Sequence, residues 1–281
     1  MFKNIVERFI KKRASLRNKE IILVGTCLKS TEDDYLFFEE AEQAIEYAYY
    51  WYSKTDLTHT LPMKNGGYFP ILQSNIVDVM EFSRYIQSLF EKSALPVVFS
   101  NNCESFTECI ADYDRCDVGV ININHRIDLV NSMSFIPMQG FVSILTQKPN
   151  TSMISVGVFE DIMTATELNL AKSLGVKWMN SASFYSTSAL NLFNELEEFL
   201  FKHEVIALNI DLKTIVRGMT IKPPFAMDLE LLLSAIKLCM HSKKVIFVHL
   251  TGENEALIFS KEVKAVLDVI RTKVENSLYA A

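Results

Sequence analysis

Short apolar runs alternate with helical patterns along the whole chain, and this alternation constrains the fold more than any other feature. Several runs are apolar at nearly every position, which is typical of strands covered by helices on both faces. Strands that alternate with helices favour a parallel sheet between two helix layers. We therefore predict a three-layer α/β/α protein with a central, mostly parallel sheet. The predicted strands are 20–27, 96–100, 117–123, 153–159, 176–179, 205–210 and 244–250.

The segments between these runs predict helices. Thr164 followed by Glu167 is the pattern of a capping box, and Gly175 predicts the end of the same helix. The polar stretch 53–70 predicts a surface loop, with a turn at the Asn-Gly-Gly of 65–67. The predicted helices are 34–54, 74–92, 164–175, 186–202, 228–242 and 260–278.

Size and composition limit the function classes. The 281 residues contain no internal repeat and no long linker, so we expect a single domain over 1–281 that begins with an amphipathic helix at about 2–17. The net charge of −6 is spread along the chain, which argues against nucleic acid or an anionic membrane as a partner. The five cysteines are odd in number and form no Cys-x-x-Cys pair, so we expect reduced thiols and a cytoplasmic location.

Polar side chains gather where the predicted strands end. In α/β sheets of this kind, ligands bind outside the carboxyl ends of the strands, which here are followed by segments 100–104, 122–128, 209–213 and 249–255. In the second segment, polar side chains alternate with apolar or imidazole side chains along the expected strand. The polar set is Asn122, Asn124, Arg126 and Asp128.

The order and spacing of these segments resemble the ureohydrolase family of arginase, agmatinase and formimidoylglutamase, over roughly residues 20–275. That family carries G-G-D-H or a variant, then D-A-H-x-D, then S-x-D-x-D-x-x-D-P. Ser100 and Asn101 match the glycine pair, and Glu253 lies near the family's late glutamate. The remaining matched positions are Cys103, Asn124, Arg126, Asp128, Asn209 and Asp211.

The resemblance implies a fold and a chemistry. Family members hold two manganese ions with carboxylates and imidazoles, and the ions activate a water that attacks a guanidinium, amidine or formimino carbon. In this sequence, Asn124 and Asn209 match two aspartates of that set, and Arg126 matches a histidine. An amide is a weaker ligand than a carboxylate, and a protonated guanidinium cannot bind a cation. The resemblance therefore implies a degenerate metal site, in which only Asp128 and Asp211 keep the acidic residue.

Three functions are consistent with these patterns. The first is an arginase-fold protein that is non-catalytic, needs no cofactor, and is retained for assembly or binding. The second is an active hydrolase of linear amidine C–N bonds that uses manganese and an unusual ligand set of Cys103, Asp128, Asp211 and Glu253. The third is an unrelated α/β small-molecule-binding protein. The metal content of the purified protein distinguishes the first function from the second. The order of the strands in the sheet shows whether the third applies.

Two side chains beside Asp128 carry further predictions. Residue alternation places His125 on a face with Ile121, Ile123 and Ile127, so we interpret it as a structural histidine, although a register shift would make it the ligand in place of Arg126. We predict that the Arg126 guanidinium occupies the metal space and pairs with Asp128, Asp211 or both. If that site is buried, removing the Arg126 side chain would lower the free energy of unfolding by roughly 3–5 kcal/mol.

The aromatic segment 47–52 (YAYYWY) predicts self-association. Together with Phe37 and Phe38 it offers more aromatic surface than one helix face usually buries. The resemblance points the same way, since ureohydrolases commonly form trimers or hexamers. We expect a homo-oligomer, with a further protein partner as an open alternative.

Overall fold

A computed structural model describes residues 20–29, 43, 46, 61–72, 76–101, 103–111, 113, 117–129, 141–181, 189–215, 227–252 and 260–272. Eight strands form one sheet in the order β2-β1-β3-β8-β7-β4-β5-β6, and every neighbouring pair is parallel. The strands are β1 (Ile21–Lys29), β2 (Met63–Leu72), β3 (Leu95–Ser100), β4 (Val118–Ile123), β5 (Thr151–Val158), β6 (Lys177–Asn180), β7 (Val205–Asp211) and β8 (Val245–Thr251).

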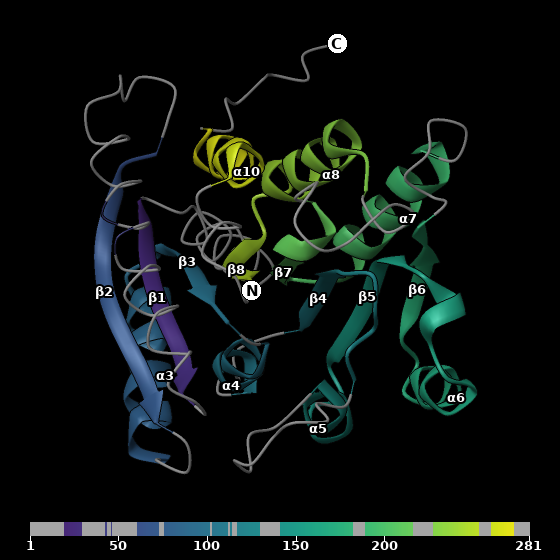
Figure 1. Cartoon of the computed structure of the whole chain (residues 1–281), viewed down its shortest axis with the longest axis horizontal. Coiled ribbons are helices and arrows are strands. Elements are labelled where there is room, and N and C mark those ends of the chain that lie inside the picture. The colour runs from purple at the N-terminus through teal and green to yellow at the C-terminus, as the bar shows by residue number, and fades with distance from the viewer. Residues whose placement is uncertain are drawn as a thin grey trace, which may run out of the picture.

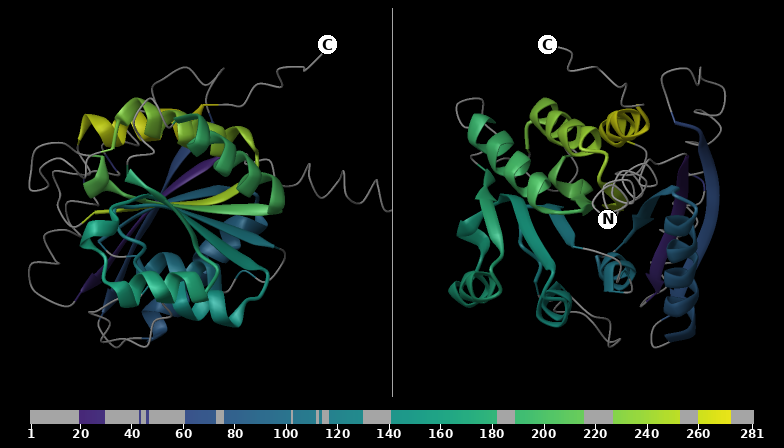
Figure 2. Two further views of the ribbon diagram at one scale, coloured as in Figure 1. Left: turned by 90° about the vertical axis from the view of Figure 1, so that its right-hand side faces the viewer. Right: turned by 180° about the vertical axis from the view of Figure 1, so that it is seen from behind.

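Helices cover both faces of the sheet (Figures 1 and 2). One layer holds α3 (Ile76–Glu91), α4 (Glu104–Ala111), α5 (Phe141–Gln147) and α6 (Ala165–Ser173). The other layer holds α7 (Ala189–Lys202), α8 (Leu229–His241) and α10 (Lys261–Arg271). The predicted three-layer α/β/α fold with a parallel sheet is therefore confirmed.

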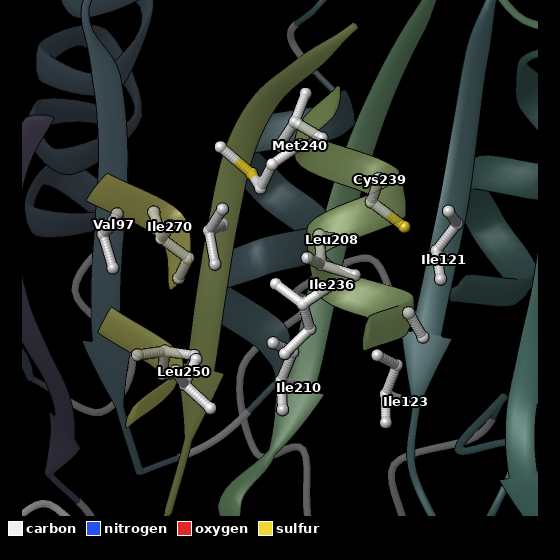
Figure 3. Packing of buried hydrophobic residues seen from close by; sticks show 14 of the residues in the cluster. Val97, Ile121, Ile123, Leu208, Ile210, Ile236, Cys239, Met240, Leu250 and Ile270 are labelled. Atoms are coloured by element: carbon white, nitrogen blue, oxygen red, sulfur yellow. The ribbon is translucent and has the colours of Figure 1, made fainter. Parts of the chain in front are cut away.

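Each face of the sheet has its own apolar core. In β7, Ile206, Leu208 and Ile210 face α8 and α10, whereas Val205 and Ala207 face the other helix layer. Figure 3 shows the first of these cores, in which Ile236, Cys239 and Met240 of α8 lie over the central strands. Because both faces are buried, the central strands are apolar at nearly every position. Each buried aliphatic side chain contributes roughly 1.5–3 kcal/mol relative to an exposed one.

The helix boundaries follow the predicted capping residues. The Thr164 side chain accepts a hydrogen bond from the backbone N–H of Glu167, and the Glu167 carboxylate accepts one from the backbone N–H of Thr164, so the capping box is confirmed. Gly175 follows that helix with a φ of +69°, a conformation that favours glycine. Asp228 is the N-cap of α8, and its side chain accepts hydrogen bonds from the backbone N–H groups of Glu230 and Leu231.

The predicted loop at 53–70 is wrong from residue 63 onward, because β2 (Met63–Leu72) pairs with β1 there. The Asn-Gly-Gly sequence makes a bulge inside this edge strand instead of a turn. Asn65 Oδ1 accepts a hydrogen bond from the N–H of Gly67, whose φ is +91°, and the register with β1 shifts opposite this point. The helices α4 and α5 were also not predicted, since each has only two turns.

Several predictions fall outside the described residues. They concern the amino-terminal helix at 2–17, the aromatic segment 47–52, Cys116 and Glu253. Of the helices that the structure describes, none is long and apolar enough to cross a membrane. Among the described cysteines, Cys27, Cys103, Cys109 and Cys239 are thiols without a disulfide bond.

Candidate functional site

A buried row of polar side chains crosses five neighbouring strands near their carboxyl ends. The parallel register places Asn122 of β4 opposite Ser155 of β5 and Asn209 of β7, and it places Asn209 opposite His249 of β8. Ser100 at the end of β3 extends the row. These side chains alternate with the apolar residues that face α8, so they point toward α4. All five are at most 1% exposed.

Hydrogen bonds join the two asparagines of this row to each other and to their neighbours. The Asn209 amide nitrogen donates to Asn122 Oδ1 over 2.7 Å. The Asn122 amide nitrogen donates to Ser155 Oγ over 3.0 Å and to the backbone carbonyl of Arg126 over 3.4 Å. A carbonyl can only accept, so these bonds fix the orientation of both amides.

The orientation of Asn209 fixes the proton on His249. Asn209 Oδ1 accepts from His249 Nδ1 over 2.7 Å and from the Thr251 hydroxyl over 3.2 Å, so Nδ1 carries the hydrogen. The other ring nitrogen, Nε2, then accepts from the Ser105 hydroxyl at 3.1 Å, and Ser105 Oγ lies 3.0 Å from Ser100 Oγ. Burial lowers the pKa of His249 to about 3, so the imidazole is neutral at pH 7.

The residues after β4 form a turn that brings two polar side chains together. The strand ends at Ile123, and the backbone N–H of Asn124 donates to Val156 in the neighbouring strand. Asn124 Oδ1 accepts from the N–H of Arg126 over 3.2 Å, while the Asn124 amide donates to the Asp128 carboxylate. Asp128 has a φ of +50°, a left-handed conformation that aspartate tolerates better than most residues.

This turn overturns the predicted alternation beyond Ile123. Ile121 belongs to the core facing α8 and Ile127 to the opposite core, so His125 does not share a face with both. The His125 ring is half-buried, and its Nδ1 lies 3.7 Å from Asp211 Oδ2. Asp211 also accepts a hydrogen bond from the N–H of Lys213 over 2.9 Å, as the N-cap of a short 3₁₀ turn, η3 (Leu212–Thr214).

The Arg126 guanidinium hydrogen bonds to a residue that the sequence did not suggest. Its Nη2 donates to Glu167 Oε1 at the start of α6 over 2.5 Å, whereas its Nε lies 4.0 Å from Asp128 Oδ1. The predicted pairing of Arg126 is therefore met only by a 4.0 Å ion pair with Asp128, which lies beyond hydrogen-bond distance, and among the described contacts Arg126 has none with Asp211. The local turn places the guanidinium beside Glu167 of α6.

The charges around the turn shift two pKa values. Burial raises the pKa of Asp128, although the positive charges of Arg126 and Lys213 oppose this shift. Burial lowers the pKa of His125, and the same two cations lower it further. Hydrogen bonds from Thr164, and then the pair with Arg126, hold the pKa of Glu167 below its usual range.

We expect Arg126→Ala to lower the free energy of unfolding by about 1 kcal/mol or less, because the Arg126 and Glu167 side chains are 38% and 32% exposed and water screens their pair. Urea unfolding of the variant and the wild type measures the difference. Arg84→Ala, on the exposed face of α3, is the control for loss of one surface cation. A decrease of 3 kcal/mol or more in the free energy of unfolding would contradict this expectation. It would support the prediction from the sequence that Arg126 is part of a buried site.

Two divalent cations do not fit the donors at this edge of the sheet. Asn124 and Asn209 offer neutral amides that are already hydrogen bonded, and Arg126 brings a permanent positive charge. Cys103 lies just before α4, in the loop that follows β3. Among the residues that the structure describes, no three His, Cys, Asp or Glu side chains form a group that could hold a metal ion.

Three residues that hydrogen bond in or beside the buried row are not marked by the sequence. Ser105, Ser155 and His249 carry no motif that marks them. Side chains alternate between the two faces of a strand, and this alternation could have indicated three members of the row. Asn122, Asn209 and His249 each lie on the same face near the end of an apolar strand. The alternation of strand residues gives no information on Ser105, because this residue lies on a short helix that the sequence did not predict.

Comparisons with known proteins identify the fold. No protein-family model matches the sequence, and no curated protein matches it. Among solved structures, arginase from Bacillus subtilis is 14% identical with a TM-score of 0.69, and the match covers 93% of this chain and 100% of that one. Formimidoylglutamase from the same organism is 15% identical with a TM-score of 0.69, over 90% and 85% of the two chains.

The agmatine ureohydrolase of Thermoplasma volcanium extends this similarity. It is 10% identical, with a TM-score of 0.62 over 91% of each chain. Identities this low establish the fold and leave the activity open. The chain therefore has the arginase-like α/β fold that its sequence resemblance implied.

Proposed function

We propose that this chain is a non-catalytic arginase-fold protein that is retained for assembly or binding. On this proposal, Asn124, Arg126 and Asn209 stand where catalytic relatives have metal ligands, and Asp128 and Asp211 are the acidic residues that remain. Manganese is the relevant ion for comparison, because a formiminoglutamase variant from Trypanosoma cruzi with the same fold contains Mn²⁺. The substitutions remove negative charge and add a cation, and both changes oppose the binding of dications.

The hydrogen bonding of Asn209 is the single observation that carries this proposal. A carbonyl oxygen has two lone pairs, and Asn209 Oδ1 already accepts from both His249 and Thr251. The amide nitrogen of Asn209 is also used, because it donates to Asn122. A cation would have to bind the carbonyl oxygen, and buried neighbours already occupy both of its lone pairs, which supports a structural role for this position.

Asp128 and Asp211 also act within the local structure. Asp128 accepts from the Asn124 amide, and Asp211 caps the turn that follows β7. These contacts support the interpretation that the two aspartates stabilise the carboxyl edge of the sheet.

We predict that the purified protein binds less than about one equivalent of manganese, because only two acidic residues remain at the matched positions. Elemental analysis of protein prepared without chelators measures this content. The matched control is Asp128→Ala, which we expect to leave the metal content unchanged. A content near two equivalents that falls in this variant would contradict the proposal.

Activity assays test the same proposal independently. We expect no urea release from arginine or agmatine, and no formamide release from formimidoylglutamate, with added manganese. Turnover that is abolished by both Asp128→Ala and Asp211→Ala would instead support the alternative of an active hydrolase with Cys103 and Glu253 as additional ligands. That alternative is favoured by one observation, which is that His125 and Asp211 already lie 3.7 Å apart.

Assembly is the part of the proposal that concerns partners. Large apolar side chains are exposed on two helices, with Phe201 86% and Leu190 72% exposed on α7 and Ile76 61% exposed on α3. Single exposed apolar residues are common on protein surfaces, and on our proposal these three take part in self-association or in the binding of another protein. Light scattering at micromolar concentration distinguishes a homo-oligomer from a monomer.

A further inference from the structure

A second group of polar side chains lies at the opposite end of the sheet, where the strands begin. His203, which precedes β7, places its Nδ1 2.8 Å from Asp117 Oδ1 and its Nε2 2.7 Å from Ser152 Oγ. Asp117 precedes β4, and Ser152 is the second residue of β5. An imidazole that joins a carboxylate through one nitrogen and a serine hydroxyl through the other has the geometry of an Asp-His-Ser triad.

The proton positions follow from the donors and acceptors. An ionised carboxylate can only accept, so His203 Nδ1 carries a hydrogen and donates it to Asp117. The neutral ring then has its lone pair on Nε2, which accepts the hydrogen of the Ser152 hydroxyl. This arrangement is the one in which the imidazole can act as a general base toward the serine.

The surrounding chain is built to hold the imidazole in this position. A side chain at Gly119 would place its Cβ 2.7 Å from the His203 ring, so the glycine allows the ring to lie directly against β4. Phe199, one turn earlier in α7, packs on the ring with centroids 4.5 Å apart. The Lys244 ammonium donates to the carbonyls of Leu200 and His203 over 2.5 and 2.7 Å, which fixes the end of the helix.

The exposure of the three residues differs in a way that suits attack on a ligand. The His203 side chain is only 8% exposed, whereas the Asp117 side chain is 38% exposed. Ser152 as a whole is partly exposed. Covalent catalysis needs a nucleophile that is activated by an adjacent base within hydrogen-bond reach, and the contact of 2.7 Å between Ser152 and His203 meets this requirement.

We propose that Ser152 Oγ is an activated nucleophile toward acyl and phosphonyl electrophiles, with His203 as its general base and Asp117 as the residue that positions the imidazole. When Ser152 Oγ attacks a fluorophosphonate, an O–P bond forms and the P–F bond breaks. The hydroxyl proton passes to His203 Nε2, and fluoride leaves with its electron pair. With an ester, the same attack forms an acyl-serine, and the departing alkoxide takes the proton from His203.

This triad is separate from the candidate site at the other end of the sheet. Ser152 shares a face of β5 with Ile154 and Val156, which face α7, while Ser155 faces α4. The triad also uses no residue of the buried row or of the turn after β4. The inference is therefore independent of the proposed function, and each can fail without the other.

The test uses a fluorophosphonate probe on the full-length protein, with the labelled residue located by mass spectrometry. A fluoride leaving group needs no acid assistance, so labelling requires only the nucleophile and its base. We expect the folded protein to be labelled at Ser152, and protein unfolded in urea to be unlabelled there, because the triad exists only in the folded chain. Absence of label on Ser152 in the folded protein would overturn the inference.

Variants separate general-base activation from simple accessibility. We expect His203→Gln to slow the labelling of Ser152 by at least about 100-fold, which is the usual contribution of a general base. Ser143→Ala is the matched control, since Ser143 is a partly buried hydroxyl that contacts the Gln147 amide instead of an imidazole. That control should retain the wild-type rate, and an unchanged rate in folded His203→Gln would refute the role of the histidine.

The role of Asp117 requires a readout that a purely structural contact would not change. Asp117→Asn replaces an obligate acceptor with an amide that can donate to Nδ1, which moves the ring hydrogen to Nε2 and blocks the base. Asp117→Glu retains an acceptor that cannot donate. We expect the asparagine variant to lose labelling and the glutamate variant to recover part of it, at similar melting temperatures. Equal labelling rates in the two variants would remove Asp117 from the inference.

Discussion

Replacing Asn209 with leucine should lower the free energy of unfolding by about 3 kcal/mol, although the two side chains have similar volumes. The change removes the acceptor of His249 Nδ1 and the donor to Asn122 Oδ1, and both of these groups are fully buried. A buried polar group that loses its partner costs about 1–3 kcal/mol. The Thr251 hydroxyl lies 3.0 Å from His249 Nδ1 and can accept its hydrogen, which offsets part of the loss.

Urea unfolding measures this difference, and the chain offers a matched control. Asn191→Leu makes the same chemical change on an exposed position of α7, where we expect a change within about 0.5 kcal/mol. A loss below about 1 kcal/mol in Asn209→Leu would mean that the row is not hydrogen bonded as described. A second variant, Ser155→Ala, removes the bond from the Asn122 amide and a long bond of 3.5 Å to the Asn122 backbone carbonyl. It should cost less than Asn209→Leu.

Most of the fold could be predicted because its strands are covered on both faces. Continuous apolar runs identified seven of the eight strands, and the capping box at Thr164 fixed the start of α6. The strand β2 was missed for a physical reason. It lies at the edge of the sheet, contains Gly66, Gly67 and Pro70, and is interrupted by a bulge, so its composition is that of a loop.

The candidate site could be located but not assembled from the sequence. Strand ends are visible as positions where apolar runs stop, and parallel strands bring those ends to one edge of the sheet. The partner of Arg126, however, lies 41 residues away on α6, and the direction of the guanidinium depends on a turn that includes a left-handed Asp128. Neither the turn nor the distant contact can be recognised from the neighbouring sequence. The prediction that Arg126 pairs with Asp211 was wrong for this reason.

The buried row explains why polar residues persist inside an apolar sheet. The nitrogen and oxygen atoms of the Asn122 and Asn209 amides and both ring nitrogens of His249 each have at least one hydrogen-bond partner. A single apolar substitution is therefore costly, whereas replacing the entire row with apolar residues could be nearly neutral. The row is consistent with a site that lost its metal and was refilled by neutral groups, as we propose.

The second large effect that we expect is a loss of stability on acidification that depends on His249. Its folded pKa of about 3 lies far below the ordinary value of 6.5, because burial penalises the charged ring. Below pH 6.5 the unfolded chain takes up a proton at this residue and the folded chain does not. The free energy of unfolding is therefore highest above pH 6.5 with respect to this residue. It falls by about 1.4 kcal/mol per pH unit as the pH drops from 6.5 toward 3.

Between pH 6.5 and 4.5, this residue alone should remove roughly 2 kcal/mol from the free energy of unfolding, because the unfolded ring is already half protonated at pH 6.5. Urea unfolding at several pH values in that window, on the wild type and on His249→Gln, isolates the effect. Because glutamine does not titrate, the variant should be less stable at pH 7 but should lose about 2 kcal/mol less on acidification. The pKa of His125 is also lowered by burial and acts in the same direction, but it is present in both proteins and cancels in the comparison.

The control for this pH comparison is His241→Gln at the end of α8. The His241 ring is exposed to solvent, so this variant makes the same histidine-to-glutamine change away from the buried row. If His249→Gln and the wild type lose the same stability between pH 6.5 and 4.5, the His249 ring is protonated in the folded chain. A charged ring donates from both nitrogens, so each nitrogen would need an acceptor. The Ser105 hydroxyl would then accept from His249 Nε2 and donate its hydrogen to Ser100.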